Sequence, residues 1–252
     1  MRILVTNDDG IHAPGLKAAE AVARELSDQV WVVAPETDQS GVAHALSLND
    51  PMRMRELGNN RFAVRGTPTD CVIMGVKYIM SEKPDLVISG VNRGHNIADD
   101  VTYSGTVAGA MEGTLLGIRS IALSQTFGIE TSDRVPFEVT EELAPDLIRK
   151  ILAKPGPQGT LYNINFPDCP VDQVKGTEVT VQGRRNAEQL RVEPRADGRG
   201  IPYYWLAFNR TRSDPAPGTD LHAIYNGKIS VTPLRLDLTD HASLSDLADS
   251  LA

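Results

Sequence analysis

The first two thirds of the chain alternate short apolar runs with longer segments in which apolar residues recur every three to four positions. The short runs predict buried strands at 3–7, 30–34, 86–89, 120–124 and 161–166. The longer segments predict helices at 15–27, 71–80 and 140–153, and a further helix of small residues begins near Ser104. This alternation indicates an α/β fold with a mostly parallel sheet flanked by helices on both faces.

The pattern changes after Pro167, where stretches rich in Gly, Pro and Arg separate short β-prone runs at 178–181, 203–208 and 229–232. We therefore expect one α/β domain over 1–252, with a core over about 1–167 and a C-terminal extension of β-hairpins over about 168–252 that ends in a helix at 243–251. Positive charge gathers in the extension at Arg184, Arg185, Arg191, Arg195, Arg199, Arg210 and Arg212. Solvated side chains explain such a group most simply. Exposed strand edges of this kind often pair with a second copy.

Composition narrows the choice of partners. The 252 residues are 41% hydrophobic and 23% charged, which is typical of a globular protein, and the formal net charge is -8. An acidic chain is a poor binder of nucleic-acid polymers, and a small anionic substrate would need a local cation or backbone donors. No apolar run approaches the roughly 20 residues of a membrane helix. Met1 and Arg2 lead straight into a strand without a signal peptide, so we expect a cytoplasmic protein with no membrane partner.

The two cysteines, Cys71 and Cys169, are far apart in the sequence. Such spacing favours reduced, buried thiols over a disulfide framework or a zinc site. Neither cysteine is therefore a strong catalytic candidate.

Two adjacent carboxylates, Asp8 and Asp9, follow the first predicted strand. Ligands of open α/β sheets bind outside the carboxyl ends of the strands, so the pair should face a crevice. Like charges side by side in a crevice indicate a cation site. The surrounding Asn7 and Gly10 also suit an ordinary turn, and this motif alone leaves both interpretations open.

Two further polar loops follow predicted strands and should lie at the same edge of the sheet. One offers Asp38 and Ser40, and the other, which contains Gly90 and Gly94, offers Asn92 and Asn96. A set of carboxylate, hydroxyl and amide oxygens suits Mg²⁺ or Mn²⁺ better than zinc. The nearby His12 and His95 are interpreted as loop residues, with His95 left open as a proton donor or phosphate contact.

Helix starts supply a candidate anion site. The N-terminus of the helix at Ser104, Gly105 and Thr106 would present free N–H groups and the positive end of the helix dipole, which suit phosphate. An ordinary Ser/Thr cap with tight packing explains the same residues.

Thr67 and Asp70 form a capping box around Pro68 that needs no functional explanation. Neither a P-loop nor a dinucleotide fingerprint is present, which disfavours triphosphate binding and hydride transfer.

An oxygen-liganded cation beside an anion-binding helix end is suited to hydrolysing a phosphate monoester. The metal would lower the pKa of a bound water and offset charge on the phosphoryl and leaving oxygens. The helix N–H groups and Asn96 would hold the remaining phosphoryl oxygens.

Five ordered blocks of sequence carry a family resemblance. They are Ile3-Leu4-Val5-Thr6-Asn7-Asp8-Asp9-Gly10 with Ala13-Pro14-Gly15, Ala34-Pro35 through Gln39-Ser40-Gly41, Gly66-Thr67-Pro68-Thr69-Asp70-Cys71-Val72, Ser89-Gly90-Val91-Asn92-Arg93-Gly94-His95-Asn96, and Asp99-Asp100-Val101-Thr102-Tyr103-Ser104-Gly105-Thr106-Val107. In these blocks the chain resembles the survival protein SurE family of metal-dependent 5'/3'-nucleotidases. The residues after Pro167 match less specifically.

The resemblance implies a Rossmann-like core whose C-terminal extension is exchanged between subunits, giving a homodimer or homotetramer. It also implies hydrolysis of nucleoside 5'- and 3'-monophosphates, with short polyphosphate as a further substrate of some members. The cofactor implied is one divalent metal ion per subunit, Mg²⁺ or Mn²⁺.

By similarity, the metal ligands would be Asp8, Asp9, Ser40 and Asn92, and the phosphate contacts would be Asn96, Ser104, Gly105 and Thr106. The catalytic residues would then be Asp8, Asp9 and Asn96, with Asp8 or Asp9 as the candidate base.

Two other hypotheses remain open. A haloacid-dehalogenase-type mechanism would use an Asp as the nucleophile, but it expects Asp-x-Asp where this chain has adjacent aspartates. A regulatory module would bind a nucleotide without turning it over.

Overall fold

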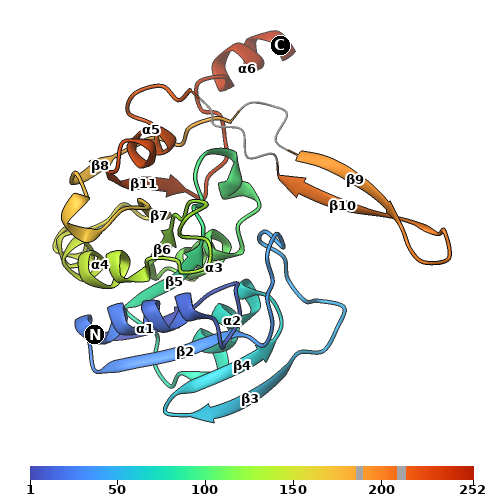
Figure 1. Cartoon of the computed structure of the whole chain (residues 1–252). Helices are drawn as coiled ribbons and strands as arrows, with labels where there is room; N and C mark the ends of the chain where they lie inside the picture. The colour runs from blue at the N-terminus through green and yellow to red at the C-terminus, as the bar shows by residue number, and fades with distance from the viewer. Residues whose placement is uncertain (186–189, 209–213) are drawn as a thin grey trace.

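The computed structural model describes residues 1–185, 190–208 and 214–252 and contains a large mixed sheet and a separate hairpin (Figure 1). The large sheet has the strand order β3-β4-β2-β1-β5-β6-β7-β11-β8. Its strands are β1 (Arg2–Thr6), β2 (Gln29–Pro35), β3 (Arg53–Gly58), β4 (Arg61–Arg65), β5 (Leu86–Arg93), β6 (Arg119–Gln125), β7 (Thr160–Phe166), β8 (Thr177–Val179) and β11 (Ile229–Arg235). The hairpin pairs β9 (Leu190–Ala196) with β10 (Pro202–Phe208).

The helices between these strands are α1 (Pro14–Leu26), α2 (Pro68–Met74), α3 (Gly105–Leu115), α4 (Phe137–Leu152) and α5 (Asp220–Tyr225), and α6 (Leu244–Leu251) follows the last strand. A π-helical segment, Gly75–Ile79, continues α2, and short 3-10 turns occupy Ala98–Thr102 and Val171–Gln173. No helix in the described part of the chain is long and apolar enough to cross a membrane.

Helices cover both faces of the sheet, as the alternating pattern predicts. Ile3 and Val5 of β1 pack in one cluster with apolar residues of α1 and α4. Leu4, between them, points to the opposite face and packs with residues of α2. The alternation of side chains along a strand thus places one core on each side of the sheet. The predicted α/β fold is confirmed.

The capping box of α2 is also confirmed. The Thr67 hydroxyl accepts a hydrogen bond from the Asp70 backbone N–H, and the Asp70 carboxylate accepts one from the Thr67 backbone N–H. Both residues are thus explained by helix initiation. The thiol of Cys71 is buried, as expected, but Cys169 is partly exposed, and both are free.

Part of the predicted C-terminal extension belongs to the large sheet. β11 pairs antiparallel with β7 and parallel with β8, so two strands after Pro167 continue the core. The β9–β10 hairpin instead projects from the body in Figure 1, as does α6 near the C-terminus. Arg210 and Arg212 lie outside the described residues.

The parallel pairing of β1 with both β2 and β5 brings the loops that follow these strands to one edge. Helix α3 lies close against this part of the sheet because Gly109 has no side chain. A Cβ at Gly109 would come within 2.7 Å of the Ser89 hydroxyl and 3.0 Å of the Thr6 methyl group. The close approach brings the N-terminus of α3 to the end of β1.

Candidate active site

The acidic pair lies at the carboxyl end of β1, as the sequence predicts. Asp8 is almost fully buried, with 4% of its surface exposed, and Asp9 is partly exposed. The preceding residue, Asn7, shapes the turn by donating from Nδ2 to the Gly10 carbonyl at 3.1 Å. The turn and the cation-site interpretations of this motif are therefore compatible, because the turn presents the carboxylates.

Helix α3 contacts Asp8 directly. The Thr106 hydroxyl, itself fully buried, donates a hydrogen bond to Asp8 Oδ1. Gly105 makes the contact possible, because a Cβ at that position would lie 2.8 Å from Asp8 Cβ and 3.2 Å from Pro68 Cγ. The side chain of Asp8 therefore occupies the space beside the first turn of the helix.

Burial of the pair disfavours its negative charge. Burial, and secondly the neighbouring Asp9 carboxylate, raise the pKa of Asp8 to about 7 against the opposing hydrogen bonds from Thr106. Burial also raises the pKa of Asp9, and the negative charge of Asp38 adds to the effect. The backbone N–H of Arg93 opposes it by donating to Asp9 Oδ2 at 3.2 Å. A cation bound between the carboxylates would remove this electrostatic cost.

Asn92, the third candidate metal ligand, lies near the carboxyl end of β5, the strand that pairs with β1. Its Nδ2 donates to the Gly94 carbonyl at 3.0 Å, which leaves the amide oxygen as the atom available to a cation. The adjacent Arg93 N–H contact to Asp9 ties this loop to the acidic pair.

Ser40, the fourth candidate, lies on the exposed loop after β2. The backbone N–H of Gln39 donates to the Asp8 carbonyl at 2.8 Å, which brings the loop to the end of β1. The Ser40 N–H donates to Asp38 Oδ1 at 2.7 Å, so Asp38 shapes the loop.

The donor set fits a hard divalent cation. Within the described ranges no group of three or more His, Cys, Asp or Glu side chains is arranged to hold a metal. A site at this edge would therefore combine the two carboxylates with the oxygens of Asn92 and Ser40. Oxygen donors of mixed charge suit Mg²⁺ or Mn²⁺.

Asn96 is held in a buried network with asparagines of β7. Its backbone N–H donates to Asn165 Oδ1 at 2.8 Å, and its carbonyl accepts from Asn163 Nδ2 at 2.7 Å. Its own Nδ2 donates to the Ser124 hydroxyl at 3.0 Å. Sequence reasoning missed Asn163 and Asn165. Two asparagines separated by one residue in an apolar strand could have indicated a buried polar network.

Ser104 is the N-cap of α3, and its hydroxyl accepts from the Val107 N–H at 3.0 Å. The capping interpretation of Ser104 is thus confirmed. Its hydroxyl and the first N–H groups of α3 lie one turn or less from the Thr106 contact to Asp8. The candidate cation and anion sites are therefore adjacent.

The two histidines near the predicted site, His12 and His95, differ in their surroundings. His12 is exposed, whereas His95 lies 3.5 Å from Asp100 Oδ2 and 3.2 Å from the Arg185 guanidinium. Sequence reasoning counted Arg185 only among the basic residues of the extension. Its contacts with His95 and Asp100 join residues far apart in the sequence, so only the tertiary structure reveals them.

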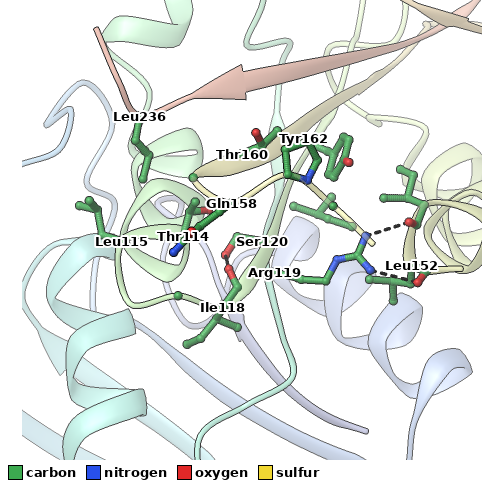
Figure 2. A pocket seen from close by; sticks show the side chains of 16 residues that line it. Thr114, Leu115, Ile118, Arg119, Ser120, Leu152, Gln158, Thr160, Tyr162 and Leu236 are labelled. Atoms are coloured by element: carbon green, nitrogen blue, oxygen red, sulfur yellow. Dashed lines mark hydrogen bonds between the residues drawn. The ribbon is translucent and has the colours of Figure 1, made fainter. Parts of the chain in front are cut away.

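A cavity of about 500 Å³ lies at the opposite edge of the sheet, where β6 and β7 begin (Figure 2). Arg119 lines it, and its guanidinium donates to the carbonyls of Ile151 at 2.8 Å and Leu152 at 3.0 Å. The cavity is therefore remote from Asp8. The polar groups at the carboxyl edge, rather than cavity size, identify the candidate site.

The fold and this edge define an α/β protein with an oxygen-rich acidic site beside a helix N-terminus. The chain belongs to the survival protein SurE family, whose family model, described as "Survival protein SurE", matches residues 3–189.

Named relatives match over the full length. The "5'-nucleotidase SurE" of Methylobacterium nodulans is 61% identical over 249 residues, which cover 98% of each chain. The protein of the same name from Mesorhizobium japonicum is 61% identical over 253 residues, covering 100% of each. The crystal structure of the SurE protein from Aquifex aeolicus aligns with a TM-score of 0.86 at 40% identity, covering 100% of both chains.

We expect Asp8→Asn to raise the melting temperature of the protein in EDTA, because the substitution removes a buried charge. Because the pKa of Asp8 is raised from 3.8 to about 7, the stability contributed by its protonated form is fully present below the lower value and is lost as the pH rises to the upper one. The difference in melting temperature between Asp8→Asn and the wild type should therefore increase between these two pH values.

Addition of Mn²⁺ should stabilise the wild type but not Asp8→Asn, because a ligand stabilises only the form that binds it. Asp28→Asn, on an exposed residue, is the matched control. An equal Mn²⁺-induced shift in wild type and Asp8→Asn, measured by differential scanning calorimetry, would exclude Asp8 as a ligand.

Proposed function

We propose that this chain is a divalent-metal-dependent 5'-nucleotidase that releases phosphate from nucleoside monophosphates. The observation that carries the proposal is the Asp8–Asp9 pair, in which Asp8 is buried against the first turn of α3 and Asp9 is partly exposed beside it. The 5'-nucleotidase name of relatives with about 60% identity over the whole chain supports it.

In this proposal Asp8, Asp9, Ser40 and Asn92 hold one Mg²⁺ or Mn²⁺ ion. When bound, the ion would favour ionisation of water and offset charge on the phosphoryl and leaving oxygens. The fixed amide of Asn92 and the Arg93 N–H on Asp9 support the proposal, because they orient ligand oxygens before any ion arrives.

The proposed phosphate contacts are Asn96, Ser104 and Gly105. The N-terminal N–H groups of α3 and the helix dipole favour a dianion at this position. Asn96 is suited to the role because its backbone is fixed by Asn163 and Asn165, which limits reorganisation during the reaction.

Thr106 receives a different role from the phosphate contact that the sequence predicts. Its hydroxyl is directed to Asp8 and is fully buried, so we assign it to orienting this carboxylate. Asp9 is the better placed of the two aspartates to accept a proton from attacking water, because Asp8 is more deeply buried.

The proposal extends to the oligomer and to further substrates. Apolar side chains are exposed on the β9–β10 hairpin at Val192, Tyr204 and Leu206 and on α6 at Leu244 and Leu247, which supports a homodimer or homotetramer built through these elements. Nucleoside 3'-monophosphates and short polyphosphate are included as further candidate substrates because they carry the same terminal phosphoryl group.

Phosphate release from a panel of purine and pyrimidine 5'- and 3'-monophosphates tests the proposal. We expect turnover with Mg²⁺ or Mn²⁺, loss of turnover in EDTA, and loss in Asp8→Asn. Nucleotide binding without turnover under any metal condition would instead favour a sensor. A trapped aspartyl-phosphate would replace activated water with an aspartate nucleophile.

Thr106→Val should weaken Mn²⁺ binding and lower kcat/KM by about 10- to 100-fold, the usual effect of removing a group that orients a metal ligand. Thr106→Ser, which keeps the hydroxyl, should restore both. Thr114→Val is the matched control, because the Thr114 hydroxyl donates to the Ala110 carbonyl within α3 and not to Asp8. Weakened phosphate binding with unchanged Mn²⁺ affinity in Thr106→Val would return Thr106 to the phosphate site.

A further inference from the structure

The segment 95–104 joins β5 to α3 and carries Asn96 near one end and Ser104 at the other. We name it the Asn96 loop. It contains a short 3-10 turn, and Ala98 adopts a positive φ of 54° that is uncommon for a residue other than glycine. Its conformation therefore depends on contacts from outside the loop.

Arg185 supplies several of these contacts from the C-terminal part of the chain. Its backbone N–H donates to Asp99 Oδ2 at 2.7 Å. Its guanidinium donates to Asp100 through Nε at 3.1 Å and through Nη2 at 2.6 Å, and Nη2 also lies 3.2 Å from His95 Nδ1. Only 9% of the Arg185 side chain is exposed, so the pair is largely shielded from water.

A second group of contacts from the same part of the chain holds Ala98. Asp220, which is fully buried, accepts from the Ala98 N–H at 2.8 Å and from the Gly183 N–H at 2.9 Å. Gln182 Nε2 donates to the Ala98 carbonyl at 2.9 Å. Both backbone polar groups of Ala98 are thus bound by residues more than 80 positions away.

The charge of Arg185 also matters for an anionic ligand. Asp99 and Asp100 lie on the same short loop as Asn96, and the net charge of the chain is already -8. Burial alone would raise the pKa of Asp100, but hydrogen bonds from His95 and Arg185 hold it below its usual value. Asp100 is therefore ionised, and Arg185 is the cation that offsets it.

We propose that Arg185 is a positioning residue for phosphate binding, acting through Asp100 and His95 on the Asn96 loop. The proposal rests on the proposed function for the identity of the substrate. It assigns the C-terminal part of the chain a direct role within the same subunit: this part sets the geometry of Asn96 and of the start of α3. The cation site, built on the loops after β1, β2 and β5, lies outside these contacts.

Arg185→Gln in the full-length protein separates the two half-sites. We expect KM for a nucleoside 5'-monophosphate to rise and kcat/KM to fall by about 10- to 100-fold, since a displacement of about 1 Å at a reacting group can cost 100-fold. The dissociation constant for inorganic phosphate, measured by calorimetry with Mn²⁺ present, should rise in parallel. The dissociation constant for Mn²⁺ should stay within about twofold, because none of the proposed ligands contacts Arg185.

Matched variants make the test specific. Arg184→Gln removes the same charge from the neighbouring exposed residue and should leave all constants unchanged. Arg185→Lys should have nearly the same KM and phosphate affinity as Arg185→Gln, because an ammonium cannot reproduce the fork of hydrogen bonds to Asp100 and His95. In Asp100→Asn, the further loss on adding Arg185→Gln should be smaller than in the wild type, because the two side chains act as one unit.

The outcomes are distinguishable. Unchanged KM and phosphate affinity in Arg185→Gln, or an equal loss of Mn²⁺ affinity, would overturn the positioning role. If Arg185→Gln does not fold, Arg185→Lys, which keeps the charge but not the fork of hydrogen bonds to Asp100 and His95, should weaken phosphate binding, and wild-type phosphate affinity in that variant would overturn the proposal. Absence of turnover in the wild type would contradict the proposed function, while the phosphate-binding measurement would still decide the role of Arg185.

Discussion

The placement of two adjacent carboxylates at the end of β1, one buried and one partly exposed, is the constraint on which the rest of the site depends. Asp8 is almost completely removed from water beside Asp9, and burial raises the pKa of both. The surrounding residues are arranged to tolerate this charge. Gly105 leaves room for the Asp8 side chain, Thr106 donates to it, and the Arg93 N–H donates to Asp9. These neutral donors stabilise the pair only in part, which supports the proposal that a divalent cation binds at this edge.

The same constraint links helix packing to chemistry. Helix α3 reaches Asp8 only because glycine at 105 and 109 allows it to lie against the ends of β1 and β5. This approach places the N-terminal end of the helix dipole next to the acidic pair. The cation that the carboxylates favour and the anion that the helix end favours would then be neighbours. A metal and a phosphoryl group held side by side are what monoester hydrolysis requires, so the function proposed here follows from the packing of one helix.

Much of the parallel core and the acidic edge could be predicted from the sequence, because each depends on local patterns. The apolar run before Asp8 and the three-to-four-residue spacing of apolar side chains in 15–27 identify β1 and α1 without knowledge of their neighbours. Strands β3 and β4 were not predicted. β3 is mostly exposed and polar, and the apolar run of β4 is only three residues long, between Arg61 and Arg65. The roles of Thr106 and Arg185 were also out of reach. Each is set by a partner about 85 or more positions away, and no local signal specifies it.

The most direct measurement is the anomalous scattering of Mn²⁺ in crystals of the protein grown or soaked with the ion. The account predicts one strong peak per subunit at the carboxyl edge of the sheet, within bonding distance of Asp8, Asp9 and the Asn92 amide oxygen. A peak at another place in the fold, or no peak at this edge at saturating Mn²⁺, would contradict it.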